Sequence, residues 1–140
     1  MAGGFVSTDN DALTEKIIGA AYSVANILGF GFLEKVYENA LAVELKALGM
    51  KVEQQKPVSV FYKSVNVGDY IADLLVEDSV LIELKSVKTL SDIHKSQLLN
   101  YLVATNKSVG LLINFGSPRI EIKRVLNSKK IIRSNPCLSV

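Results

Sequence analysis

Three ionisable side chains lie inside a stretch that otherwise has the pattern of two apolar strands. The stretch is YIADLLVEDSVLIELKSV, residues 70–87, and the three side chains are Asp73, Glu83 and Lys85. Burying a charge is costly unless a partner compensates it. If the turn is centred on Asp78, Asp73 lies opposite Glu83 with Cβ atoms about 5 Å apart. Lys85 then shares their face, whereas a one-residue shift in register would move Asp73 off it.

Two interpretations of this cluster are open. In the first, the charges form a network of ion pairs on an exposed sheet face, and Lys85 neutralises one acid. In the second, they form a divalent-metal site, because Mg²⁺ takes oxygen ligands and often binds one or two carboxylates together with water and phosphate. The cation would cancel the repulsion between the acids, and the lysine would orient or deprotonate a water.

A third carboxylate lies within the apolar arc of a predicted helix over residues 32–48. At 100° per residue, Glu34 falls within about 60° of four apolar side chains, which are Tyr37, Leu41, Leu45 and Leu48. An acid on a core-facing stripe needs a partner. Glu34 is therefore either a glutamate that reaches solvent or a lysine, or a third acid directed at the hairpin.

A polar helix face follows the hairpin in sequence. Gln97 and Tyr101 are four residues apart and share a face with His94, a pattern that by itself is typical of a solvated surface. We expect His94 and Cys137 to be ordinary surface residues, because neither has a partner at metal-ligand or triad spacing.

Hydrophobic periodicity predicts the elements that must position these side chains. A first helix is expected from caps at residues 8–10 to Leu28, and further helices over 32–48 and 91–105, the last capped by Ser91. Strands are expected over 51–65 (two short strands, or one edge strand interrupted by Pro57), 69–76, 80–87, 109–115 and 119–126, with residues 66–70 as a turn. The helix between strands 80–87 and 109–115 makes those strands parallel neighbours. The expected fold class is α/β (α+β), with helices flanking a central mixed sheet.

Composition is that of one globular domain. The chain has 140 residues, 49% of them hydrophobic and 21% charged, which is enough for a real core. We expect a core over about 11–126 and a flexible tail over 127–140. The single cysteine excludes an intramolecular disulfide and a cysteine-based zinc site. Without an apparent signal peptide or membrane span, a cytoplasmic location is expected.

By several short motifs, the sequence resembles the PD-(D/E)XK nuclease superfamily, whose members have a restriction-endonuclease-like core. IADLLVEDSVLIELKS is similar to the superfamily signature, an Asp, a turn and then E-x-K, although Ala72 stands at the variable position before the Asp. QLLNY resembles the Q-x-x-x-Y motif of the RecB-like branch. GFLEKVY, residues 31–37, and GLLINFG, residues 110–116, resemble the small bacterial GxxExxY proteins.

This resemblance implies hydrolysis of phosphodiester bonds by a water that Mg²⁺ activates, with Mn²⁺ able to substitute. Asp73 and Glu83 would hold the metal, and Glu34 would complete its shell or hold a metal-bound water. Lys85 would position or activate the water, and Gln97 and Tyr101 would orient Lys85, a water or the phosphate.

The second half of the chain is basic, with Asp92 and Glu121 as its only acids between Lys85 and Arg133. A basic surface suits a polyanion, or is simply solvated. Candidate phosphate contacts are Lys88, Lys95, Lys107, Lys123, Arg124, Lys129 and Lys130. Nucleic acid is the expected partner, DNA rather than RNA, and a homodimer or protein partner would help to choose the substrate. The alternative function is a nucleic-acid-binding or protein-interaction module on the same fold with little or no catalysis.

Overall fold

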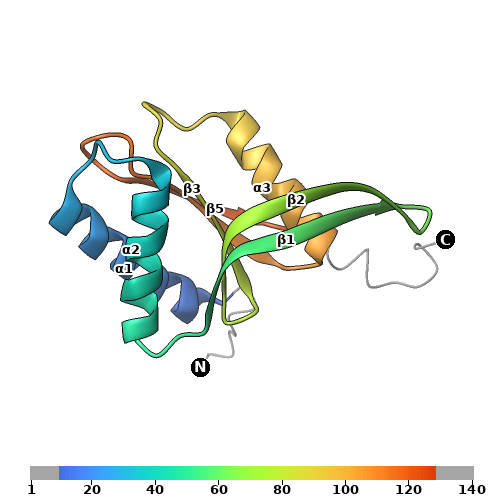
Figure 1. The fold of residues 1–140 in the computed structure, drawn as a ribbon, viewed down its shortest axis with the longest axis horizontal. Coiled ribbons are helices and arrows are strands. Elements are labelled where there is room, and N and C mark those ends of the chain that lie inside the picture. Colours follow the sequence, from blue (N-terminus) through green and yellow to red (C-terminus); the bar gives the residue numbers. More distant parts are fainter. Residues whose placement is uncertain (1–9, 129–140) are drawn as a thin grey trace, which may run out of the picture.

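The computed structural model describes residues 10–128, in which three helices flank one five-stranded mixed sheet (Figure 1). The elements in chain order are α1 (Asp11–Leu28), α2 (Glu34–Ala47), β1 (Val52–Tyr62), β2 (Val65–Val76), β3 (Val80–Lys85), α3 (Asp92–Thr105), β4 (Val109–Asn114) and β5 (Glu121–Leu126). The strands lie in the sheet in their order along the chain. Only the β3–β4 pair is parallel in this sheet, as the crossover through α3 requires. The expected fold class is confirmed.

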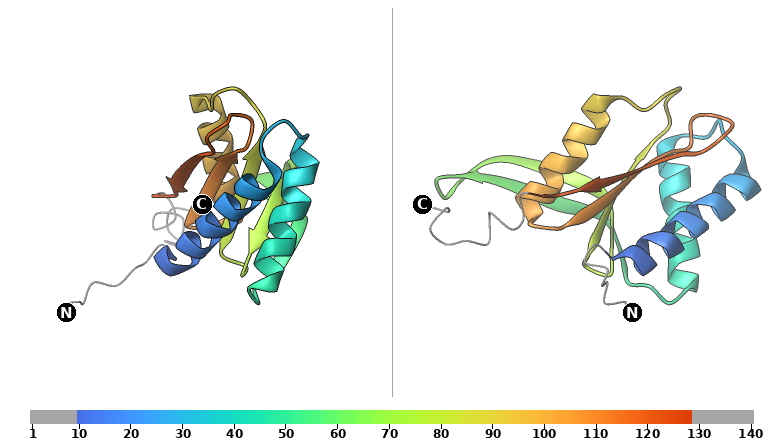
Figure 2. Two further views of the ribbon diagram at one scale, coloured as in Figure 1. Left: turned by 90° about the vertical axis from the view of Figure 1, so that its left-hand side faces the viewer. Right: turned by 180° about the vertical axis from the view of Figure 1, so that it is seen from behind.

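The helices form two layers on opposite faces of the sheet (Figure 2). One face packs on α1 and α2 through side chains that alternate along the central strands, such as Leu74, Ile82 and Leu111. The other face packs on α3, where Leu81 and Leu112 meet Leu98. Because β3 and β4 are covered on both faces, every residue of β4 is buried.

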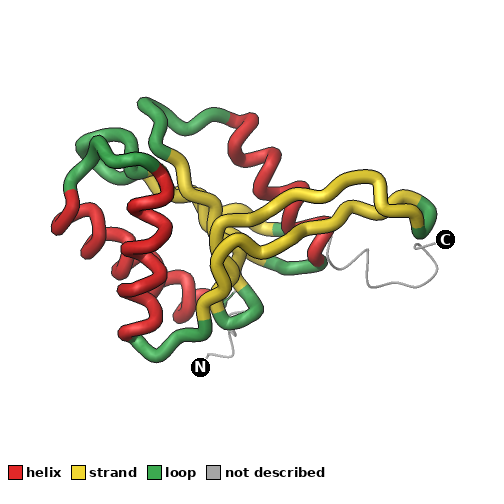
Figure 3. Tube along the Cα trace, in the orientation of Figure 1, coloured by secondary structure: helices red, strands yellow, loops and turns green. Residues whose placement is uncertain are grey.

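The long hairpin of β1 and β2 extends beyond the helical layers as an arm (Figure 3). The stretch 51–65 forms one edge strand with Pro57 inside it, the second of the two expected alternatives. The expected turn at 66–70 is wrong, because these residues belong to β2. The chain turns instead at Lys63 and Ser64, which both adopt left-handed backbone angles as a tight hairpin turn demands.

The polar residues that suggested a turn bond to one another on the exposed arm. Asp69 accepts hydrogen bonds from Ser59, across the hairpin, and from Asn66, both at 2.9 Å. Turn-forming residue types thus serve here as a polar network between two paired strands.

Two other boundaries differ from expectation. β3 ends at Lys85, and the next residues leave the sheet as a loop that contacts β4 through Asn114, whose side chain bonds to Val87 N–H at 3.0 Å and to Val87 C=O at 2.9 Å. Asn127, placed in the tail from sequence, is buried and donates to the carbonyl of Lys107 at 3.0 Å. The tail prediction for residues 129–140 lies outside the described part of the chain.

Gly116, just after β4, is required by close packing against the loop that follows Lys85. A Cβ at this position would lie 2.3 Å from the backbone nitrogen of Val87. No side chain fits there, so the glycine sets how closely the loop after β4 supports the loop after β3.

Candidate active site

Asp73 and Glu83 lie where β2 and β3 stop pairing through their backbones. The predicted register is confirmed for the three pairs from Val76–Val80 to Leu74–Ile82. At the next position, where Asp73 lies opposite Glu83, hydrogen bonds between side chains and backbone replace the backbone ladder. Asp73 N–H donates to Glu83 Oε2 at 2.8 Å, and Leu84 N–H donates to Asp73 Oδ2 at 2.7 Å. Each carboxylate is therefore fixed by the strand that carries the other, and the two acids are held together.

Burial and proximity raise the pKa of both carboxyl groups. The pKa of Glu83, whose residue is only 6% exposed, rises to about 8, chiefly because burial disfavours its charge and secondly because of Asp73. Burial likewise raises the pKa of Asp73, partly offset by the Leu84 N–H bond. A bound cation would favour the charged forms of both carboxyl groups, which burial and their proximity disfavour.

Lys85 is the nearest cation to this pair along β3. It is partly buried at the end of the strand, and its charge lowers the pKa of both Asp73 and Glu83. Among residues 10–128, it forms no ion pair within 4 Å. The closed ion-pair network of the first interpretation is therefore absent, and the lysine stands near the acids without neutralising either by direct contact.

Glu34 reaches the same end of the hairpin from α2. Its Oε2 accepts a hydrogen bond from Ser86 N–H at 3.3 Å, and its charge raises the pKa of Asp73 and Glu83. Glu34 does not lie on the core-facing stripe, because it is the first residue of α2 and the buried face begins at Tyr37, so its side chain is exposed, as the alternative of a glutamate that reaches solvent predicts. The interpretation that directs it at the hairpin fits this position.

The residues around Glu34 explain how α2 is placed. Gly31 has φ of 117°, which favours glycine, in the loop before the helix. Tyr37 is fully buried, donates to Gly29 C=O at 2.6 Å and stacks on Phe115 with ring centroids 4.4 Å apart. The glycine shapes the loop and the tyrosine anchors it, so both fix where Glu34 begins the helix.

Sequence reasoning missed Glu38, the buried acid of α2. It is 3% exposed and accepts hydrogen bonds from Gln54 at 2.7 Å, Gln55 at 2.9 Å and Lys35 at 3.2 Å. Its charge is also among the causes that raise the pKa of Asp73. The signal was available, since Glu38 is one helical turn after Glu34 and next to Tyr37.

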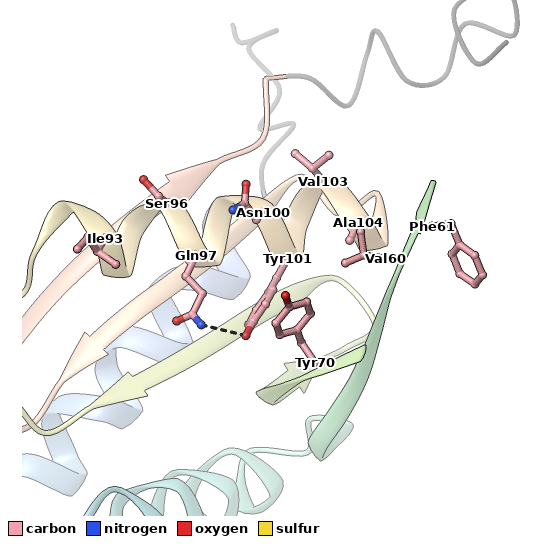
Figure 4. Close-up of a pocket in the computed structure, with 10 residues that line it drawn as sticks. All are labelled: Val60, Phe61, Tyr70, Ile93, Ser96, Gln97, Asn100, Tyr101, Val103 and Ala104. Carbon is pink, nitrogen blue, oxygen red and sulfur yellow. Dashed lines mark hydrogen bonds between the residues drawn. The ribbon is translucent and has the colours of Figure 1, made fainter. Parts of the chain in front are cut away.

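Gln97 and Tyr101 meet above the sheet on α3, as their spacing predicts (Figure 4). Gln97 Nε2 donates to the Tyr101 hydroxyl at 3.2 Å. Burial raises the pKa of Tyr101, and the charges of Glu83 and Asp73 raise it further. This hydroxyl therefore lies within electrostatic reach of the carboxylates. His94 does not join them, because its Nδ1 accepts from Ser91 N–H at 3.1 Å and caps the helix.

The candidate phosphate contacts include exposed lysines and basic residues that bond to acids of the chain. Lys88 and Lys95 are exposed, on the loop after β3 and the first turn of α3, at the same end of the sheet as Lys85. Lys123 is exposed on β5. Two others have internal partners: Arg124 bonds Asp11 of α1, and Lys107 bonds Asp78.

The position of Lys107 argues against the proposed phosphate contact. It is tied to the β2–β3 turn, at the end of β3 opposite the acids, and so it lies away from the candidate site. Lys129, Lys130 and Cys137 lie outside the described residues.

No three His, Cys, Asp or Glu side chains within residues 10–128 come together as a ready group of metal ligands. Asp73 and Glu83 are a pair, and Glu34 does not join them at ligand distance. Two carboxylates nevertheless suit Mg²⁺, which keeps several waters and uses substrate phosphate as a further ligand. The carboxylates of Asp73 and Glu83 therefore suit a metal ion that is bound by only two protein side chains.

In the described part of the chain, no helix is long and apolar enough to cross a membrane. Among curated proteins, no match to the chain is found. Among solved structures, the chain is similar to SSO0001, known from a crystal structure, with a TM-score of 0.55 and 19% sequence identity. That match covers 89% of this chain and 68% of the other, and it supports the fold alone. The model of one family matches residues 11–125, a range that includes every element described above except the last residue of β5. By this match, the chain belongs to the PD-(D/E)XK nuclease superfamily.

Proposed function

We propose that this protein is a metal-dependent nuclease that hydrolyses phosphodiester bonds, with Mg²⁺ as the metal (Mn²⁺ as a substitute) and DNA favoured over RNA. Within the superfamily, we place it in the GxxExxY family of the RecB-like branch, on the strength of Gly31, Glu34, Tyr37, Gln97 and Tyr101. The observation that carries the proposal is the pair of carboxylates that replaces the β2–β3 ladder beside Lys85, which forms no ion pair within 4 Å among residues 10–128.

In this proposal Asp73 and Glu83 hold the metal, and Glu34 orients a water beside it. The metal, when bound, supplies Lewis-acid stabilisation of phosphate charge and lowers the pKa of a water. Lys85 has no ion pair within 4 Å in the described chain, so its ammonium is available to position the attacking water and to stabilise charge on the phosphate.

Gln97 and Tyr101 are assigned as orienting groups. The amide of Gln97 fixes the direction of the Tyr101 hydroxyl through the 3.2 Å hydrogen bond. A hydroxyl held in this way can donate to a phosphate oxygen or orient the Lys85 ammonium. Their contribution is geometric, and neither needs to change its charge.

Phosphates on either side of the cleaved bond would meet Lys88 and Lys95, which are exposed at the same end of the sheet. Lys123 is a further candidate, and Arg124 is the least suited because Asp11 already binds it. Such contacts add affinity without sequence information. We propose a cytoplasmic location, and we expect a homodimer or protein partner to help to select the substrate.

A second candidate function, nucleic-acid binding without turnover, is favoured by two observations. Both carboxylates already accept backbone hydrogen bonds, and the residues 10–128 contain no ready group of three metal ligands. A site whose charged residues only stabilise the fold would have the same two features. Cleavage assays separate the two functions.

The test uses supercoiled plasmid, linear DNA and RNA with purified protein in Mg²⁺, Mn²⁺ or EDTA. We expect metal-dependent cleavage of DNA, and a loss of about 100-fold or more for Lys85→Ala. Lys46→Ala, which removes an exposed lysine near the end of α2, is the matched control and should cleave normally. Binding without cleavage in every divalent metal would overturn the nuclease and support the second candidate, and cleavage of RNA alone would overturn the preference for DNA.

A further inference from the structure

A pocket of about 630 Å³ lies between α3 and the β1–β2 arm (Figure 4). One wall is the face of α3 that carries Ser96, Gln97, Asn100 and Tyr101. The other wall is the arm, which contributes Tyr70 from β2 and Val60 and Phe61 from β1. Its size is in the range of pockets that bind small organic ligands.

The lining selects for a flat, neutral, polar-edged ring. None of the lining side chains, all from the described part of the chain, is charged, so the pocket offers no cation to a phosphate. It offers the partly exposed aromatic ring of Tyr70, at 49%, together with the amides and hydroxyl of Gln97, Asn100 and Ser96, whereas the ring of Phe61 lies on the other side of β1 (Figure 4). Aromatic faces stack on nucleobases, and amides bond to nucleobase edges.

The pocket shares two residues with the candidate active site. Gln97 and Tyr101 line it and also form the orienting pair assigned above. The Tyr70 ring lies against the Tyr101 ring with centroids 5.7 Å apart, and Figure 4 shows the two rings side by side. A chain whose phosphate lies at Asp73 and Glu83 would therefore place a neighbouring base at this opening.

We propose that this pocket binds an unpaired nucleobase next to the cleaved phosphodiester, so that the protein acts on single-stranded nucleic acid. This inference rests on the proposed nuclease function. A base inside a duplex has both faces covered by its neighbours and its edge occupied by its partner, so it cannot enter without being extruded. A base in a single strand presents its face and edge at little cost.

The experiment measures binding in EDTA, where no cleavage occurs under the proposed mechanism. A fluorescently labelled single strand is compared with the duplex of the same sequence, on wild type, Tyr70→Ala and Tyr62→Ala. Tyr62 is the matched control, because it is a similarly exposed tyrosine of the same arm, at 64%, and does not line the pocket. We expect tighter binding of the single strand by wild type. Tyr70→Ala should weaken binding of the single strand by about 5- to 150-fold and leave duplex binding unchanged. Tyr62→Ala should bind both nucleic acids as wild type does.

A second variant, Ser96→Phe, fills the pocket from the exposed face of α3 and decides the case if Tyr70→Ala does not fold. It should produce the same selective loss. A 2-aminopurine base in the single strand should be quenched by wild type and by Tyr62→Ala, but not by Ser96→Phe. Equal affinity for single strand and duplex, or equal binding by the two tyrosine variants, would overturn the inference while leaving metal-dependent cleavage intact. Selective binding of the single strand without cleavage in any metal would instead refute the proposed nuclease function and support the proposed base-binding pocket.

Discussion

Glu83→Gln should stabilise the metal-free protein at neutral and alkaline pH. Glutamine has nearly the same shape as glutamate, and its amide oxygen can still accept the hydrogen bond from Asp73 N–H. The substitution removes only the negative charge. Its effect on the free energy of unfolding therefore reports what that charge costs in the folded protein.

The sign and size follow from the pKa of Glu83. In the unfolded chain the carboxyl loses its proton near the ordinary pKa of 4.5, whereas the folded protein holds its pKa at about 8. Between these values the folded state binds more protons than the unfolded state, so stability falls as pH rises. The relation gives a loss on the order of 2–3 kcal/mol between pH 5 and pH 7. The raised pKa of Asp73 acts in the same direction.

Urea denaturation from pH 5 to pH 9 in EDTA provides the measurement. The curve of wild type should fall relative to that of Glu83→Gln, and Glu15→Gln, at an exposed position of α1, should follow wild type. Adding Mg²⁺ should restore stability to wild type above pH 7 and do little for Glu83→Gln, because a cation that binds the folded state stabilises it. Parallel curves for wild type and Glu83→Gln would refute the idea that a buried charge at this position destabilises the fold.

Three further substitutions test the residues that support the site, each by urea denaturation. Glu38→Ala should cost about 2–3 kcal/mol, because it removes the charged acceptor of the hydrogen bonds from Gln54, Gln55 and Lys35, whereas Glu38→Gln should cost less. Tyr37→Phe should cost about 1–2 kcal/mol through loss of the bond to Gly29; an unchanged stability would contradict its anchoring role. Gly116→Ala should cost about 1–3 kcal/mol and reduce cleavage, since its methyl group would meet backbone. Gly19→Ala, in open space on a helix, is its control and should be neutral or stabilising.

The sequence predicts the centre of the molecule well because local rules decide it. Alternation and a short turn fix the register of β2 and β3, and that register brings Asp73 to Glu83. The apolar crossover helix fixes the parallel β3–β4 pair. These features need no knowledge of distant contacts.

The features that escaped prediction depend on residues far apart in the chain. Helical spacing places Glu38 near the buried face of α2, but its partners Gln54 and Gln55 come from β1, and no local pattern shows that pairing. Arg124 resembles any surface cation until α1 brings Asp11 to it. The misplaced hairpin turn has a similar cause: the asparagine, glycine and aspartate of residues 66–69 are turn formers by type, yet cross-strand bonds hold them in β2.

The order of the strands in the sheet has a consequence for how the chain folds. Each strand pairs with the next one along the chain, so the antiparallel pairs close only short loops and the entropy lost in forming them is small. The hydrogen bond from Ser86 to Glu34 joins residues 52 positions apart and closes a much longer loop. The sheet can therefore assemble by successive local steps, and the end of the molecule that carries the candidate active site is completed only when α2 docks.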